Sequence, residues 1–401
     1  MTVRSQVRGT TAVETHGAIL DLIRSTGVVS RTELADRSGL TGSSITRIVR
    51  QLLDDGLVME TGFGQSTGGK RRTLLQLNPA ARTAIGISLD YDQITYIAAD
   101  LSGTVIARRT GRGTTAKSPS LVTRRIAREV AELVAQAGLD KLLVVGIGVG
   151  VAGRRGRTDA GWFNATATEW EHFPLEDILG DATGWPVIVD NDSTCAAIGE
   201  YWAGRVPATE QVATVYVTDG FGLGLMVNGE IYRGASGNAG ELGHVTIDPR
   251  GPVCVCGRRG CLEVMAGAAR IVELAHRDEG LVAERRLAGT ARTVRSDYAK
   301  IARAAAAGDE RARRLIAQAA NHLASALVSI TNVLDLDRII LAGPAFRFVG
   351  GIYADAVTER LTAACWARAV HPVAVELSGL GSDVAALGAA SLALRTRLTL
   401  R

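Results

Sequence analysis

The most specific chemistry in this 401-residue sequence belongs to a histidine and three cysteines. Three of the five cysteines fall within eight residues, and nine residues separate the first of these from the histidine. Three thiolates and one imidazole make up the ligand set of a closed, tetrahedral Zn²⁺ site, whose role is structural rather than catalytic. The sequence therefore predicts a structural zinc site formed by His244, Cys254, Cys256 and Cys261.

The alternative explanation is that these are unrelated buried cysteines. Cysteine is rare elsewhere, where only Cys195 and Cys365 occur, and we expect both of those in the core. Gly257 and Gly260 allow the tight turns that bring three thiolates together. Crowded thiols in a reducing compartment favour metal binding over disulfides.

The expected compartment is the cytoplasm. The first ten residues carry two Arg, but no apolar segment typical of a secretory signal follows them. No apolar run approaches the roughly 18–20 residues of a membrane helix, so we expect no membrane partner. A hydrophobic fraction of 46% with 21% charged residues is ordinary for a globular protein and excludes wholesale disorder.

The N-terminal residues form a pattern of helices that carries polar and cationic side chains rather than metal ligands. Apolar spacing predicts helices over 15–25, 31–38 and 41–54, the order of a helix-turn-helix, and the second begins at a Ser-x-x-Glu capping box. The exposed side of the third helix carries short hydrogen-bonding side chains followed by cations: Ser43, Ser44, Thr46, Arg47 and Arg50. Such a helix can read base edges in a major groove and hold phosphates with its arginines.

A glycine-rich hairpin between predicted strands 57–62 and 73–78 ends in three consecutive cations, Lys70, Arg71 and Arg72. A basic wing of this kind suits a phosphate backbone or a narrow minor groove. Residues 1–80 hold ten Lys or Arg and seven acids, a charge of +3 out of +4 for the chain. We therefore predict that residues 13–78 are a winged helix-turn-helix that binds double-stranded DNA; a protein-docking module is the alternative.

After residue 80, predicted strands and helices alternate twice, which favours two α/β lobes with a cleft between them. The predicted strands are 84–89, 94–99, 105–109, 142–151, 187–189, 213–218, a hairpin over 222–232, and 338–342. The predicted helices are 120–137, one beginning at 193, 266–276, 297–307, 309–334, and a last helix after 383.

Three stretches of this body resemble the ROK family (repressors, open reading frames, kinases). They are residues 189–200, residues 222–244, which end in Ala-Gly-Glu-Leu-Gly-His, and the zinc segment, which ends in Cys-Leu-Glu. With the winged N-terminus and residues 381–390, the resemblance covers almost the whole chain. It implies an α/β protein with an N-terminal winged helix-turn-helix followed by a two-lobed actin-like ATPase/sugar-kinase (ROK) fold. Lobe 1 would span 82–192, completed by the C-terminal helix 383–401, and lobe 2 would span 193–382, in a homodimer or homotetramer.

The resemblance also implies a sugar or sugar derivative between the lobes. The implied contacts are Asn191, Asp192, Glu241, His244 and Glu263, with Asn164 as a further candidate. His244 would bind zinc through one ring nitrogen and a sugar hydroxyl through the other. For Asp192 or Glu263 alone, a helix cap or a surface acid is the alternative.

Two loops argue against phosphoryl transfer by this chain. In kinase members the acid equivalent to Asp192 is the general base, and a loop of the form Asp-x-Gly-Gly-Thr follows the first strand. Here residues 88–92 read Ser-Leu-Asp-Tyr-Asp, and residues 218–222 read Thr-Asp-Gly-Phe-Gly where Gly-Thr-Gly-x-Gly is expected. A phosphate cradle needs exposed backbone N–H groups and no carboxylates, so we expect Asp90, Asp92 and Asp219 to repel a triphosphate.

The sequence thus favours a sugar-responsive DNA-binding transcriptional regulator, a repressor, with no kinase activity. An ATP-dependent sugar kinase with an appended DNA-binding domain is the alternative. A third hypothesis is an adaptor whose N-terminal module binds a protein.

Overall fold

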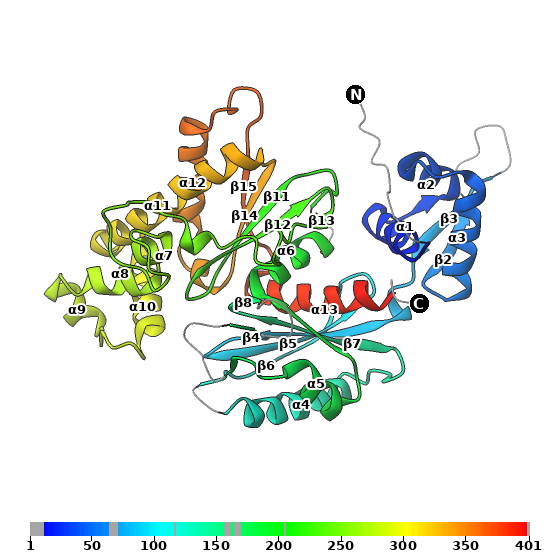
Figure 1. Cartoon of the computed structure of the whole chain (residues 1–401), viewed down its shortest axis with the longest axis horizontal. Helices are drawn as coiled ribbons and strands as arrows, with labels where there is room; N and C mark the ends of the chain where they lie inside the picture. The colour runs from blue at the N-terminus through cyan, green and yellow to red at the C-terminus, as the bar shows by residue number, and fades with distance from the viewer. Residues whose placement is uncertain are drawn as a thin grey trace.

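The computed structural model describes residues 12–63, 71–115, 118–155, 162–163, 170–203 and 206–398. A small N-terminal unit stands beside two larger lobes, each built on a five-stranded sheet (Figure 1). Two helices lie between the two sheets, and they connect the functional regions described below.

The N-terminal unit has the three predicted helices. They are α1 (Ala12–Thr26), α2 (Arg31–Ser38) and α3 (Gly42–Asp54). The predicted capping box is present, because the Ser30 side chain accepts from the Glu33 N–H while the Glu33 carboxylate accepts from the Ser30 N–H. Thr41 caps α3, as expected. Strands β1 (Val29–Ser30), β2 (Val58–Phe63) and β3 (Thr73–Leu77) pair in the order β1-β3-β2.

The first lobe has the sheet order β10-β7-β4-β5-β6. Its strands are β4 (Thr83–Leu89), β5 (Gln93–Asp100), β6 (Val105–Arg112), β7 (Val144–Val151) and β10 (Val187–Asn191). Helices α4 (Pro119–Gln136) and α5 (Leu175–Thr183) cover one face (Figure 1). The short elements η1 (Pro79–Ala81), β8 (Arg154–Arg155) and β9 (Trp162–Phe163) complete this part.

The second lobe has the sheet order β13-β12-β11-β14-β15. Its strands are β11 (Val212–Val217), β12 (Phe221–Val227), β13 (Glu230–Ile231), β14 (Arg338–Ala342) and β15 (Ala374–Leu377). Its helices are α7 (Leu262–Ala266), α8 (Ala268–Ala275), α9 (Glu279–Arg285), α10 (Val294–Ala306), α11 (Glu310–Leu334) and α12 (Gly350–Ala364). The 3₁₀ turns are η3 (Leu242–His244), η4 (Pro344–Phe346) and η5 (Gly381–Asp383).

Helices α6 (Asp192–Trp202) and α13 (Val384–Leu398) pack against each other between the sheets. Glycines make this close approach possible. A Cβ on Gly388 would run into the carbonyl of Cys195, and a Cβ on Gly199 would run into the carbonyl of Val384. Gly86 in β4 likewise admits the backbone of α13 onto the first sheet.

The predicted fold class is confirmed, and the buried strands and long helices lie within a few residues of their predicted positions. Helices α5, α7, α9 and α12 and strand β15 were not predicted. The helix predicted over 266–276 is α8 alone, because the chain leaves helical geometry at Gly267 between α7 and α8.

Candidate functional site

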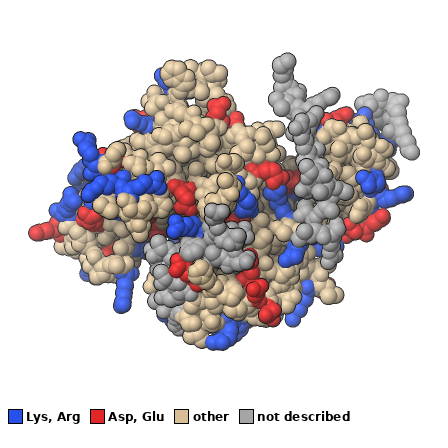
Figure 2. Space-filling model, viewed as in Figure 1, with Lys and Arg blue, Asp and Glu red and all other residues tan. Residues whose placement is uncertain are grey.

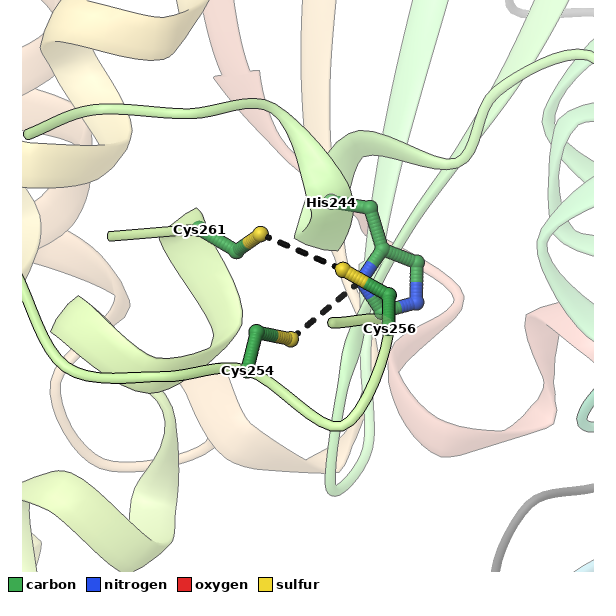
Figure 3. Close-up of side chains that lie close together, drawn as sticks. All are labelled: His244, Cys254, Cys256 and Cys261. Atoms are coloured by element: carbon green, nitrogen blue, oxygen red, sulfur yellow. Dashed lines mark hydrogen bonds between the residues drawn. The ribbon is translucent and has the colours of Figure 1, made fainter. Parts of the chain in front are cut away.

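The predicted metal ligands come together in the loop between η3 and α7 (Figure 3). Their ligand atoms all lie within 4.8 Å of one another. The Sγ of Cys254 is 3.6 Å from Nδ1 of His244, and the Sγ atoms of Cys256 and Cys261 are 3.6 Å apart. Gly260 makes the turn at a φ of +63°, where a Cβ would also run into the carbonyl of Asp248.

This donor set fits a tetrahedral zinc ion. Zinc–ligand bonds of about 2.0–2.3 Å place neighbouring donor atoms roughly 3.5–3.8 Å apart, which matches the two separations of 3.6 Å. The backbone N–H of Arg258 lowers the pKa of Cys256 to about 6, which favours the metal-binding thiolate. Because Nδ1 of His244 faces the thiols, its Nε2 is the nitrogen left for a ligand outside the cluster.

Glu263 ties the metal loop to the second sheet. Its Oε2 accepts the backbone N–H of Phe221 at 3.1 Å. Burial raises the pKa of Glu263, while the N–H of Phe221 and the nearby His244 act against that rise. Glu241 is exposed immediately before η3, and its charge reaches both Glu263 and Asp192. The structure thus brings Asp192, Glu241, His244 and Glu263 to one region.

Asn191 and Asp192 stand at the start of α6, where β10 ends. The Oδ1 of Asn191 caps the helix by accepting from the N–H groups of Ser193 and Thr194, and its amide donates to the carbonyl of Gly153 at 2.8 Å. The helix cap that the sequence left as the alternative for Asp192 is therefore made by Asn191. Within the described part of the chain, the carbonyl of Gly153 is the acceptor found for this amide, which has a second hydrogen to offer a ligand.

Asp192 is half-buried, and its surroundings disfavour the ionised form of its carboxyl. Burial raises its pKa to about 7, and the charges of Asp90 and Glu241 act in the same direction, against the N–H of Ser193. A carboxyl in this state exchanges its proton near neutral pH, which suits a group that both donates to and accepts from hydroxyls.

We expect Asp192→Asn to stabilise the ligand-free protein at pH 8, by at most about 4 kcal/mol for a shift of about three pKa units. Because the folded pKa lies above the unfolded value, the native state holds the extra proton between about pH 4 and pH 7. Wild-type stability therefore falls as the pH rises through that window, and the variant lacks this fall. Melting temperatures at pH 5 and pH 8 measure it, with the exposed Asp355→Asn in α12 as the control. Equal pH dependence in Asp192→Asn and wild type would contradict the assignment.

Arg295 is the residue that the sequence analysis missed. It projects from the first turn of α10 and pairs with Asp90, Asp92 and Asp219, three acids in the two loops expected to repel phosphate. Its Nη1 lies 3.1 Å from Asp92, and its guanidinium lies 5.8 Å from the centre of the Tyr91 ring. Burial alone would lower the pKa of Arg295, but bonds and charges from Asp219 and Asp90 raise it.

This pairing corrects the electrostatic reasoning from the sequence, which counted the three acids as uncompensated. One cation offsets part of their charge, and its side chain stands between the two loops. The contact also joins the lobes, since Asp90 follows β4 while Asp219 and Arg295 belong to the second lobe. Local sequence carries no signal for it, because 205 residues separate Arg295 from Asp90.

The DNA-facing candidates lie on the outer side of α3. Ser43, Thr46, Arg47 and Arg50 are exposed, while Ser44 is half-buried and bonded to the cap Thr41. Arg71 and Arg72 are exposed just before β3, whereas Lys70 and Asn164 lie outside the described residues. Figure 2 shows Lys and Arg at the outer edge of this unit with acids beside them, so its surface is of mixed charge.

Comparison with known proteins gives a matching family model for the N-terminal unit and another for the body. A model of the ROK family matches residues 84–396, and a winged helix-turn-helix DNA-binding model matches residues 14–59. In the part of the chain that the structure describes, no helix has the length and apolarity to cross a bilayer.

Two curated relatives represent the two activities weighed above. The xylose repressor of Caldicellulosiruptor bescii is 26% identical over 381 residues, covering 95% of each chain. A glucokinase of Halalkalibacterium halodurans is 31% identical over 279 residues, covering 67% of this chain and 82% of the enzyme. The fold matches the crystal structure of a ROK family transcriptional regulator, a homologue of the E. coli MLC protein, with a TM-score of 0.72 at 24% identity over 96% of this chain and 97% of the other.

Proposed function

The chain belongs to the ROK family, and from this we propose that it is a sugar-responsive transcriptional regulator, a repressor that binds an operator in double-stranded DNA. The observation that carries the proposal is the winged helix-turn-helix joined to the family's body in one continuous hydrophobic core, which includes Leu34, Leu75, Trp202 and Leu387. The similarity to a xylose repressor along 95% of both chains supports the same function.

The proposed effector site comprises Asn191, Asp192, Glu241, His244 and Glu263. Carboxylates, an amide and an imidazole suit the many hydroxyls of a sugar, because each can donate to or accept from a hydroxyl. The name of the xylose repressor makes a free pentose the first candidate effector. The metal proposed at the cysteine cluster is zinc, whose role is to fix the orientation of His244.

We further propose that the chain has no sugar kinase activity and that Asp192 has no catalytic role. The support is Arg295, whose guanidinium stands between Asp90 and Asp219 in the two loops that cradle phosphates in kinase members. Nucleotide binding would have to displace this side chain and leave three carboxylates facing a polyphosphate. The similarity to a glucokinase keeps the kinase as the second candidate function.

The proposed division of the chain is 13–78 for DNA binding, 82–192 with 383–401 for lobe 1, and 193–382 for lobe 2. A palindromic operator calls for at least two DNA-binding units, so we propose a homodimer or homotetramer in the cytoplasm. The DNA contacts proposed are the exposed face of α3 and the cations Lys70, Arg71 and Arg72.

The test uses a duplex selected from random sequences by the purified protein. We expect D-xylose, D-glucose or N-acetyl-D-glucosamine to change the affinity for this duplex by about fivefold or more, measured by fluorescence anisotropy. ATP consumption with the same sugars should stay below about one turnover per second, a modest enzyme rate. Failure to select any duplex would favour the adaptor, and faster ATP consumption would favour the kinase.

A further inference from the structure

Helix α6 has a functional group at each end. Its first residue, Asp192, belongs to the proposed sugar site, and its last two, Tyr201 and Trp202, contact the DNA-binding unit. At about 1.5 Å per residue, these eleven residues span roughly 16 Å. The helix therefore links the two regions directly.

The far end of α6 holds α1 through a buried polar cluster. Arg24 donates to the carbonyl of Trp202 at 2.6 Å, and its guanidinium lies 4.4 Å from the centre of the Trp202 ring and 5.2 Å from that of Tyr201. The Tyr201 hydroxyl donates to Asp21 at 2.7 Å, and Asp21 in turn accepts from Arg24 at 2.9 Å. The side chain of Arg24 is only 5% exposed, so these contacts act away from bulk water.

The middle of α6 is closely packed against its neighbours. Every residue from Cys195 to Trp202 is buried. Glycines in its neighbours bring the backbones into direct contact, because a Cβ on Gly224 of β12 would meet Ala197 and a Cβ on Gly388 of α13 would meet Cys195. A close-packed helix of this kind moves as a unit when one end is displaced.

The contact between α6 and α1 leaves a polar group without a partner beside a pocket. The indole N–H of Trp202 is buried and has no acceptor among the described residues, which is costly in a fixed core. A pocket of about 200 Å³ that opens to solvent, lined in part by Ile23, Arg24 and Trp202, lies at the same junction. Space and an unsatisfied donor at one point allow these side chains to shift relative to each other.

We propose that α6 transmits occupation of the sugar site to the DNA-binding unit, and that Tyr201 and Trp202 are positioning residues acting through Asp21 and Arg24. A ligand that bonds Asp192 changes the charge and the contacts at the start of α6. The resulting shift changes where Trp202 holds α1, and so changes the placement of α3 against DNA. This mechanism rests on the proposed function, since it requires a sugar that alters operator affinity.

Two conservative variants test the proposal. Tyr201→Phe removes only the hydroxyl bonded to Asp21, and Arg24→Lys keeps the charge but loses the planar stacking on Trp202. Operator affinity is measured with and without D-xylose, D-glucose and N-acetyl-D-glucosamine, and the ratio is the coupling factor. We expect each variant to lower this factor by about fivefold or more, while sugar affinity without DNA stays within about twofold of wild type.

Matched controls are Tyr232→Phe, at an exposed tyrosine of the second lobe, and Arg31→Lys, whose partner Glu60 lies within the DNA-binding unit. Both should couple like wild type. If wild type itself shows no coupling, the proposed function fails and this mechanism with it. If wild type couples and Tyr201→Phe and Arg24→Lys couple equally well, the function stands and the role of α6 is wrong. Tyr201→Phe removes only the hydroxyl group, so we expect the variant to fold. A melting temperature close to that of wild type would verify this.

Discussion

Cys261→Ser is expected to abolish stoichiometric zinc binding and to weaken sugar binding by about tenfold or more. A fully buried thiolate ligand would be lost, and His244, which shares the cluster, would lose its fixed orientation beside Glu263. Elemental analysis of the purified protein measures the metal, and thermal shifts with the sugar panel measure binding. Removal of zinc from the wild type with a chelator should give the same loss, and readdition should restore it.

The control for this prediction is Cys365→Ser. Cys365 is also buried, with 3% exposure, but it lies outside the metal cluster. The control should retain about one zinc per chain and normal sugar binding. The metal assignment would be contradicted if wild-type protein, purified in the absence of a chelator, contained no zinc. Unchanged sugar affinity in Cys261→Ser would show that sugar binding does not depend on the metal.

Arg47→Ala is expected to weaken binding to the selected duplex by about 1–3 kcal/mol and to relax its sequence preference. Arg47 lies exposed on the outer side of α3, whose inner side packs Ile45, Ile48 and Val49 into the core. The side chain is therefore available to DNA while the helix fold is kept. Anisotropy titrations against the selected duplex and single-base variants measure both effects.

The wing is tested by neutralising Lys70, Arg71 and Arg72 together. Loss of up to three phosphate contacts should make the binding constant for DNA less dependent on salt concentration. The slope of log K against the logarithm of the salt concentration should become shallower by up to about 2.7. The control neutralises three exposed arginines of the second lobe, Arg313, Arg314 and Arg360, and so changes the net charge equally. If both triple variants give the same salt slope, the basic wing does not contact DNA.

The sequence predicted those parts of the fold that local chemistry determines. The Ser30–Glu33 capping box, the Thr41 cap and the alternating apolar strands each depend on residues a few positions apart. The cysteine cluster was equally accessible, because all of its ligands lie in one short segment with glycine turns. Helices α9 and α12 were missed, since their apolar residues are few or interrupted and packing in the second lobe stabilises them.

The candidate site was predictable only where its residues follow one another in the chain. The place of Asn191 and Asp192 at the start of α6 follows from the strand-to-helix transition. The pairing of Arg295 with Asp90 depends on how the two lobes face each other, and the contact of Arg24 with Trp202 joins residues 178 positions apart. Long-range contacts of this kind leave no mark on periodicity or spacing.

The Arg295 cluster also constrains how this chain can evolve. A lone substitution that restores glycine at Asp90 removes one of the counter-charges of Arg295, while a lone loss of Arg295 leaves three clustered carboxylates without their shared cation. Loss of Arg295 raises the repulsion among the three carboxylates, and neither first step by itself recreates a phosphate cradle. A phosphate cradle of the kinase form would thus need several coordinated mutations in these two loops.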